Sequence, residues 1–344
     1  MKRKLLALVA MTAVAGAQAQ SSSVTIFGVA DVSVAHISTS GKSVSGLANG
    51  GNSSSRLGFR GEEDLGGGLK AGFWLEAGLN VDDGGPAGGL KFDRRSTVSL
   101  LGNFGELRLG RDKTPTYQNL ETFHVFGDTG MGAINGHSLI SGSAAGTPEG
   151  SNPKRVSNSL SYLLPKLGGV YGQVTHSFGE QAGDASLSSS TGLRLGYAAG
   201  PLNVAAGYGI VRGGTSAADV DYKTFNLGAS YQLAAVTPML LIASERGNGK
   251  RVDLYSVGVK MPLGAGELRA AYTWYRDKKQ DNADSGRLAL GYGYKLSKRT
   301  EIYAAVARLS NDDKAARKLG SSLSPTPGVG NSLTGYEIGL RHNF

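Results

Sequence analysis

The 344-residue chain contains no cysteine, so disulfides cannot stabilise it and its stability must come from backbone hydrogen bonds and packing. Proline is scarce, with 10 residues, whereas 53 residues are glycine without a three-residue period. That composition excludes a collagen-like chain and suits many strands joined by turns. After position 20 there is no run of eighteen apolar residues, and the sequence therefore predicts no transmembrane helix.

Signatures of catalysis are also missing. The chain has no nucleophile elbow, no paired zinc-ligand histidines and no glycine-rich phosphate loop between a strand and a helix, so we expect neither an enzyme nor a cofactor. The acidic pairs at 82–83 and 312–313 are too small to predict calcium, because exposed acidic pairs are usually just solvated. The net charge of +9 comes from dispersed cations rather than one basic stripe, which argues against nucleic-acid binding.

Residues 1–19 have the layout of a cleavable secretory signal. Lys2, Arg3 and Lys4 precede an apolar run over 5–14, and small residues follow at 17–19. The apolar run is too short to span a bilayer, although a retained anchor is the alternative. We expect an exported mature domain over 20–344, with a net charge of about +6 once the three cations are removed.

The end of the chain shows the clearest strand pattern. Within 333–344 one face carries apolar side chains and the other carries polar ones: Tyr336, Ile338, Leu340 and Phe344 against Glu337, Arg341 and Asn343. Such a strand fits the edge of a soluble sheet or the wall of an outer-membrane β-barrel, where lipid-facing and lumen-facing residues alternate.

The same alternation recurs along the chain and predicts sixteen strands. Their ranges are 24–36, 54–63, 69–80, 92–103, 105–112, 155–164, 170–179, 191–199, 203–212, 222–233, 237–246, 251–262, 267–278, 285–296, 300–311 and 333–344. Short glycine-containing turns alternate with long polar stretches at 37–53, 113–154 and 312–332. Half-polar strands exclude a buried parallel sheet, and alternating connections are typical of outer-membrane barrels. The sequence therefore predicts an all-β, 16-stranded antiparallel transmembrane β-barrel.

Three segments carry a resemblance to a known family. Residues 55–71 (SRLGFRGEEDLGGGLKA), 94–98 (RRSTV) and 102–111 (GNFGELRLGR) resemble the general porins of β-proteobacteria, which include the neisserial and the Comamonas- or Burkholderia-type porins. The resemblance implies a homotrimer in the outer membrane of a Gram-negative bacterium, in contact with lipid and lipopolysaccharide. It also implies a third long loop, about 113–154, that folds inward to narrow the pore. The terminal Phe344 resembles the signal read by the barrel-assembly machinery.

Several arginines are expected in the pore. Arg56 and Arg60 alternate with Leu57 and Phe59, so their side chains project into the lumen, and Arg155 does so by the same parity. In the pair 94–95, strict alternation directs Arg95 inward, whereas the family resemblance favours Arg94. We therefore keep both and expect a local bulge.

An arginine cluster in a narrow passage attracts small anionic solutes and repels cations. The alternative is that these arginines only pair with lumenal acids such as Glu76, Glu62 or Asp31. The resemblance implies an acidic residue on the inward loop, and His124 stands at the matching position, where a neutral imidazole would favour anions further. A solvated surface histidine is the alternative for His124.

Two functions remain open. The first is a passive diffusion porin that prefers anions. The second is an outer-membrane barrel that acts mainly as a binding, adhesin or structural protein with a restricted lumen. Small residues at lumenal positions favour an open lumen, because bulky plugs need bulky partners: Gly196, Ala198, Ala289, Gly291 and Gly293.

Overall fold

The computed structural model describes residues 22–85, 89–134, 139–140, 153–180, 187–215 and 218–344. These residues form one antiparallel sheet of seventeen strand segments and the helix α2. The predicted signal segment at 1–19 lies outside the described residues. Among the helices in the described ranges, none is long and apolar enough to cross a membrane.

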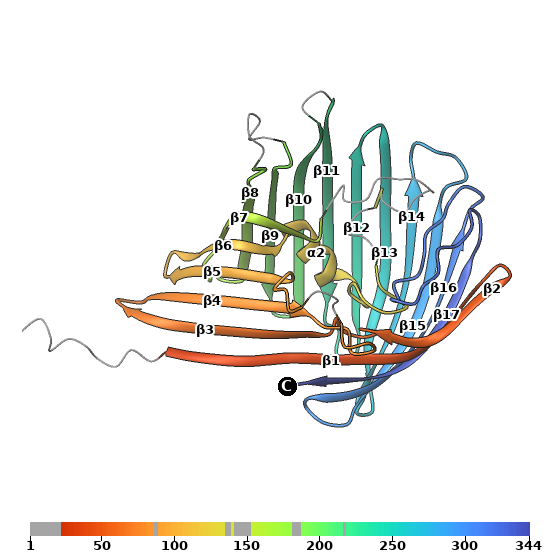
Figure 1. Cartoon of the computed structure of the whole chain (residues 1–344), viewed down its shortest axis with the longest axis horizontal. Helices are drawn as coiled ribbons and strands as arrows, with labels where there is room; N and C mark the ends of the chain where they lie inside the picture. The colour runs from red at the N-terminus through yellow and green to blue at the C-terminus, as the bar shows by residue number, and fades with distance from the viewer. Residues whose placement is uncertain (1–21, 86–88, 135–138, 141–152, 181–186, 216–217) are drawn as a thin grey trace, which may run out of the picture.

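The elements are shown in Figure 1. In chain order they are β1 (Ser22–Thr39), β2 (Lys42–Asn49), β3 (Arg56–Gly66), β4 (Leu69–Gly78), β5 (Arg95–Gly102), β6 (Gly105–Lys113), α2 (Pro115–Phe123), β7 (Arg155–Leu163) and β8 (Val170–Ser177). The second half continues with β9 (Ser190–Ala199), β10 (Leu202–Thr215), β11 (Ala218–Tyr231), β12 (Thr237–Gly247), β13 (Lys250–Leu263), β14 (Gly266–Asp277), β15 (Ser285–Lys295), β16 (Thr300–Asn311) and β17 (Leu333–Asn343).

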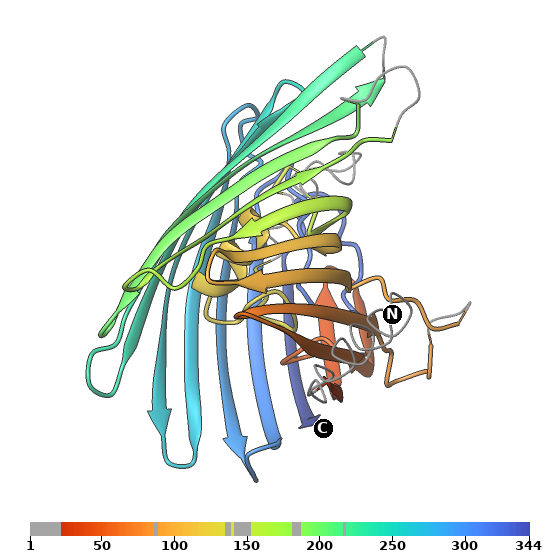
Figure 2. The same cartoon turned by 90° about the vertical axis from the view of Figure 1, so that its left-hand side faces the viewer.

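The strands close into a ring. Each strand from β3 to β17 pairs antiparallel with the next one along the chain. β1 completes the ring, because its edges pair with β3 and with β17. The ring thus contains sixteen strands, β1 and β3–β17, and the predicted fold class is confirmed. Figure 2 shows the strands leaning across the wall.

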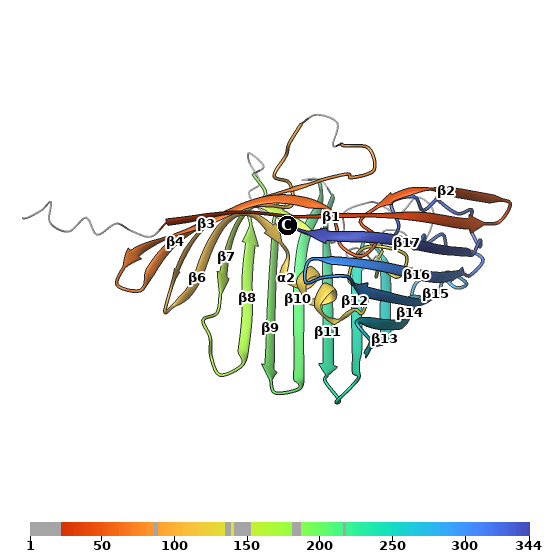
Figure 3. The same ribbon diagram turned by 90° about the horizontal axis from the view of Figure 1, so that it is seen from below.

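The remaining segment, β2, lies inside the first long stretch that the sequence marks as a loop. β1 is longer than predicted, and its first part, up to Val29, pairs with β3, while the part from Val32 to Thr39 pairs with β2. Gly41 has a φ of 68°, which allows the tight turn between the two strands. The hairpin therefore covers the edge of β1 beyond the end of β3, as Figure 3 shows.

The two faces of the wall differ as the alternation predicts. In β17, Tyr336 and Ile338 are each 58% exposed on the outer face, whereas the intervening Glu337 is only 3% exposed on the lumenal face. Phe344 follows β17, and its backbone exchanges two hydrogen bonds with Gly28 of β1, at 3.0 and 3.1 Å. The last residue of the chain thus belongs to the seam that closes the ring.

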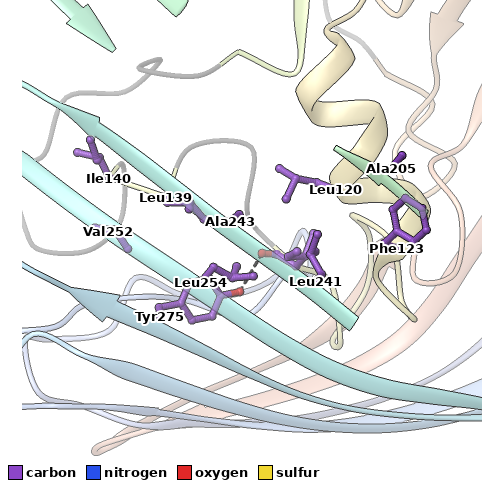
Figure 4. Close-up of a cluster of buried hydrophobic side chains, with 11 residues drawn as sticks. Leu120, Phe123, Leu139, Ile140, Ala205, Leu241, Ala243, Val252, Leu254 and Tyr275 are labelled. Carbon is purple, nitrogen blue, oxygen red and sulfur yellow. Dashed lines mark hydrogen bonds between the residues drawn. The ribbon is translucent and has the colours of Figure 1, made fainter. Parts of the chain in front are cut away.

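The described residues between β6 and β7 (114–134, 139–140 and 153–154) fold into the lumen, and we refer to them as the constriction loop. α2 begins at the N-cap Thr114, whose hydroxyl accepts a hydrogen bond from the Tyr117 amide at 3.3 Å, and Pro115 supplies the favoured first position. One side of the loop packs against the inner faces of β10, β12, β13 and β14 (Figure 4). That cluster comprises Leu120, Phe123, Ile134, Leu139, Ile140, Ala205, Leu241, Ala243, Val252, Leu254 and Tyr275.

Small lumenal residues of the wall make room for this loop. A Cβ atom on Gly228 of β11 would lie 2.2 Å from the Phe123 ring, and one on Gly258 of β13 would lie 2.3 Å from the Val125 side chain. Likewise, a Cβ atom on Gly291 of β15 would lie 2.8 Å from the Phe126 ring. Glycine at these positions therefore seats the loop, which gives Gly291 a specific role beyond leaving the lumen open.

The last long connection, 312–332, also reaches inward. Leu319 packs with Met131 of the constriction loop in a second buried cluster. Arg317 donates from Nη2 to the Leu139 carbonyl at 2.7 Å, and its guanidinium lies 4.3 Å from the centre of the Tyr275 ring. Burial lowers the pKa of Arg317 to about 10, so the side chain stays charged at neutral pH. The constriction loop is thus held by the wall and by a second loop.

Candidate functional site: an arginine-lined constriction

A cavity of about 580 Å³ lies between the constriction loop and the inner faces of β3–β7 and β9. We call it the arginine cavity, because seven cationic side chains line it against four carboxylates. The cations are Arg56, Arg94, Arg95, Arg108, Lys113, Arg155 and Arg194, and the acids are Glu76, Asp112, Glu121 and Asp128. The lining therefore carries an excess of three positive charges.

Five of the sequence-predicted site residues meet here: Arg56, Arg94, Arg95, Arg155 and Glu76. Arg56 lies in β3, Glu76 in β4, Arg95 in β5 and Arg155 in β7, and Arg94 directly precedes β5. The ring therefore brings together positions that are far apart in the chain. Arg60 and His124, which were predicted with them, do not line this cavity. Arg60 lines a separate recess nearer the short-turn rim of the barrel.

Both members of the pair 94–95 reach the arginine cavity without a bulge. The β4–β5 register runs unbroken from Glu76 opposite Arg95 to Lys70 opposite Leu101. Arg95 points inward from the first position of β5, whereas Arg94 precedes the strand and is free of its alternation. The sequence left open whether Arg94 or Arg95 faces the pore. Both do, because β5 begins at Arg95 and Arg94 lies just before it.

Glu76 organises the cations on one side of the cavity. Its carboxylate lies 2.7 Å from Arg94 Nε and 3.9 Å from Arg56 Nε, and it accepts a bond from the Trp74 indole at 3.2 Å. Because Glu76 is only 13% exposed at its side chain, the Arg94 pair is screened less than a surface pair. Glu76, which also contacts Arg56 and Trp74, therefore holds the Arg94 side chain in a defined orientation.

A second group of charges is built on β6. Arg108 makes a bidentate pair with Glu106, at 2.8 and 2.9 Å, and bonds to Asp112 at 2.6 Å. Asp112 also lies 3.6 Å from Arg95. These carboxylates neutralise part of the arginine charge. Of the arginines predicted from the sequence, Arg56, Arg94 and Arg95 have a carboxylate oxygen within 4.0 Å.

Two arginines stand apart from these carboxylates. In the described ranges no acidic oxygen lies within 4.0 Å of Arg155 or Arg194. Arg155 also has a buried Nε without a hydrogen-bond partner in these ranges. Arg194 is held by neutral groups, Asn119 at 2.9 Å and Thr122 at 3.1 Å, with its guanidinium over the Tyr171 ring. These two side chains can therefore offer N–H donors to a passing anion.

His124 is placed elsewhere than the resemblance implies. It is 3% exposed, and its Nε2 lies 3.3 Å from the Thr273 hydroxyl of β14. Burial, followed by the positive charge of Arg287, lowers the pKa of His124 well below its usual value, so the imidazole is neutral at pH 7. His124 thus helps to seat the loop against the wall and does not line the arginine cavity.

The constriction loop instead presents Glu121 and Asp128 to the arginine cavity. Glu121 pairs with Lys113 at 2.6 Å, and Asp128 pairs with Lys154 at 3.3 Å and accepts a bond from the Tyr117 hydroxyl. Burial acts to raise the pKa of Asp128, but Lys154 and Tyr117 outweigh it and the pKa is lowered. Both acids are therefore already paired within the loop region.

Arg108 and Arg194 were not among the sequence-predicted pore residues, although alternation could have found them. Arg108 stands between Leu107 and Leu109, which are 40% and 53% exposed on the outer wall, and Arg194 stands between two outward leucines. The same parity argument that selected Arg56 applies to both. In contrast, Glu121 and Asp128 lie in irregular or helical chain, where no period-two signal exists.

A model of the Gram-negative porin family matches residues 7–314. The chain belongs to this family. It is 39% identical to outer membrane porin protein 32 of Delftia acidovorans over the whole of both chains. It is 29% identical to an outer membrane porin protein of Bordetella pertussis, over 88% of this chain and 93% of that one. Among solved structures it is similar to an anion-selective porin from Comamonas acidovorans, with a TM-score of 0.86 and 36% identity over 94% of this chain and 100% of that one.

The porin is therefore an outer-membrane protein of a Gram-negative bacterium, and its barrel is a diffusion pore. Both family and fold are those of a channel. In the described part of the chain, no group of three or more His, Asp or Glu residues is arranged to hold a metal ion. The arginine cavity acts on solutes through the charges of its arginines and carboxylates.

Glu76→Gln tests how far this carboxylate offsets the pore cations. The change removes the acid that pairs with Arg94 and Arg56, so the preference for chloride over sodium should rise. A unit charge a few ångströms from an ion in water-like surroundings contributes up to about 1 kcal/mol, which corresponds to a change of roughly threefold or more for each ion. The measurement is the reversal potential of single channels in a salt gradient. An unchanged or lower chloride preference would contradict the role of Glu76.

Proposed function

We propose that this porin is a general diffusion channel selective for small anionic solutes. The observation that carries the proposal is the charge of the arginine cavity, where four acids oppose seven cations and Arg155 and Arg194 have no carboxylate within 4.0 Å in the described residues. The similarity to a porin that is itself described as anion-selective supports it. The proposal assigns no catalytic role to any residue.

The physical basis is the difference between charge that is cancelled locally and charge that remains. Arg94, Arg95 and Arg108 lie beside carboxylates, so at a distance their fields largely cancel. Arg155 and Arg194 face the same cavity from β7 and β9, farther from its acids. An anion entering from the loop side therefore meets a positive potential in a passage walled by low-dielectric protein, whereas a cation is repelled.

The test is the reversal potential of Arg155→Gln and Arg56→Glu channels. Both variants lower the positive charge of the cavity, and each should reduce the chloride-to-sodium permeability ratio by roughly threefold or more while the barrel still folds, because the side chains lie in a water-filled lumen. Lys166→Gln is the matched control, since it removes one charge from the exposed turn after β7. Cation preference in the wild-type channel would refute the proposed selectivity.

We propose that the porin assembles as a homotrimer and is exported with removal of residues 1–19. The trimer is inferred from the family, and the apolar outer face of the wall is compatible with such contacts. Mass spectrometry tests both statements on protein purified from outer membranes. Native spectra in mild detergent should show three copies, and the denatured mass should correspond to a chain that starts at Gln20. A single copy, or retention of the N-terminal residues, would refute the respective statement.

We also propose that Phe344 is read by the barrel-assembly machinery and that the outer face contacts lipid and lipopolysaccharide. The Phe344 backbone closes the seam with Gly28, and its side chain is 46% exposed on the outer face. Deleting Phe344 should lower the amount of heat-modifiable, folded barrel recovered from outer membranes. The channels that do assemble should keep the wild-type reversal potential, because Phe344 does not line the arginine cavity. Normal assembly without Phe344 would contradict this role.

A further inference from the structure

Arg60 lies in a second recess, separate from the arginine cavity in most of its lining. This recess has a volume of about 300 Å³ and is bounded by residues near the short turns, among them Ser23, Gly61 and Glu106. Short turns of outer-membrane barrels face the periplasm. A solute that has passed the constriction therefore meets this recess next, and we call it the exit recess.

The guanidinium of Arg60 is held by aromatic rings and not by a carboxylate. Its central carbon lies 5.3 Å from the centre of the Phe27 ring and 5.1 Å from that of the Trp74 ring. Those two rings contact each other edge-on, with 5.0 Å between their centres. Across the described ranges, no acidic oxygen lies within 4.0 Å of Arg60, although Glu62 and Glu106 also line the exit recess.

The two acids of the exit recess are already engaged with other cations. Glu62 pairs with Lys70 at 3.3 Å, and Glu106 makes its bidentate pair with Arg108. The charges of Glu62 and Glu106 are thus offset by Lys70 and Arg108, whereas no neighbouring carboxylate in the described residues offsets the charge of Arg60. This separates Arg60 from Arg108, which lines the same recess but donates three hydrogen bonds to carboxylates.

Contact with ring faces leaves the edge of a guanidinium available. A planar guanidinium stacks on arenes through its face, and its five N–H donors lie in its plane. The in-plane fork matches the two oxygens of a carboxylate, which a lysine ammonium cannot match in the same way. Phe27 and Trp74 therefore contact Arg60 while leaving its in-plane donors for an oxyanion.

Trp74 connects the exit recess to the constriction. Its ring contacts Arg60 on the recess side and also Arg95, at 4.5 Å, and it lines both the exit recess and the arginine cavity. Arg95 likewise lines both. Trp74 and Arg95 therefore form a continuous surface from the arginine cavity to Arg60, along which an anion can pass without crossing the lumen.

We propose that Arg60, oriented by Phe27 and Trp74, is a second anion-binding station that takes carboxylates as they leave the constriction toward the periplasm. The inference rests on the proposed anion-selective function and extends it. It predicts that the channel binds carboxylates in two steps, whereas chloride, which cannot use a planar fork, responds mainly to the overall charge.

Single-channel conductance measured against salt concentration tests this, with sodium formate and sodium chloride as the two probes. Formate conductance in the wild type should saturate, and Arg60→Lys should raise the half-saturating formate concentration by about threefold or more, because it loses a charge-assisted bidentate contact in a recess open to water. The chloride-to-sodium reversal potential of Arg60→Lys should stay at the wild-type value, since the charge is retained. Arg60→Gln should change both measurements.

Two further variants separate the station from a general effect of charge. Lys70→Gln removes a cation from the same rim, but one that is ion-paired with Glu62, and should leave formate saturation unchanged. Trp74→Leu removes the ring that holds Arg60 and should raise the half-saturating formate concentration, while Trp74→Phe, which keeps a ring, should largely restore it. Each variant is first checked for folded, heat-modifiable barrel.

The outcomes distinguish this inference from the function on which it rests. Wild-type formate saturation in Arg60→Lys, or an equal loss in Lys70→Gln, would overturn the second station while leaving anion selectivity intact. A wild-type reversal potential that favours sodium would instead overturn the proposed function itself. Linear formate conductance in the wild type would also refute the station, because no saturable site would then exist.

Discussion

The structure depends on closing the backbone hydrogen-bond ladder into a ring. In hydrocarbon an unpaired N–H or C=O group costs several kcal/mol, and a sheet with free edges would expose two rows of them. β1 removes both edges by pairing with β17 on one side and β3 on the other, and the hydrogen bonds between Phe344 and Gly28 extend that seam to the last residue. The lumen and the constriction loop lie inside this ring.

Closure creates a cylinder that is too wide to be filled by its own side chains, and the constriction loop determines what remains open. The loop is seated on one half of the wall through Leu120, Phe123 and neighbouring apolar residues, over glycines such as Gly228 that leave space for it. The opposite half of the wall, β3–β7, keeps its charged side chains facing water. The asymmetry of the pore, apolar contact on one side and arginines on the other, thus follows from where the loop packs.

The sequence predicts most of the wall because a half-buried strand has a local signal with period two. That signal located sixteen strands and the lumenal position of Arg56. Arg155 also lines the cavity, but the β6–β7 register shifts between Gly110 and Asp112, so strict alternation does not extend to it. It could not predict β2, which lies in a polar stretch and forms only because β1 offers an uncovered edge. Nor could it place Glu121 or His124, since the orientation of a loop inside the lumen is set by contacts with distant strands and not by neighbours in sequence.

The pore arginines also help to specify the register of the barrel that contains them. Shifting a strand by one residue exchanges its two faces, so a slip in β3 would turn Arg56 and Arg60 toward lipid and bring Leu57 and Phe59 into the lumen. An arginine on the lipid face costs roughly 2–4 kcal/mol near the midplane of the bilayer. The charges that select solutes therefore disfavour the misregistered barrel. Lumenal arginines of this kind are therefore favoured both by function and by the need for a single strand register. In a soluble protein, by contrast, a buried charge usually lowers stability.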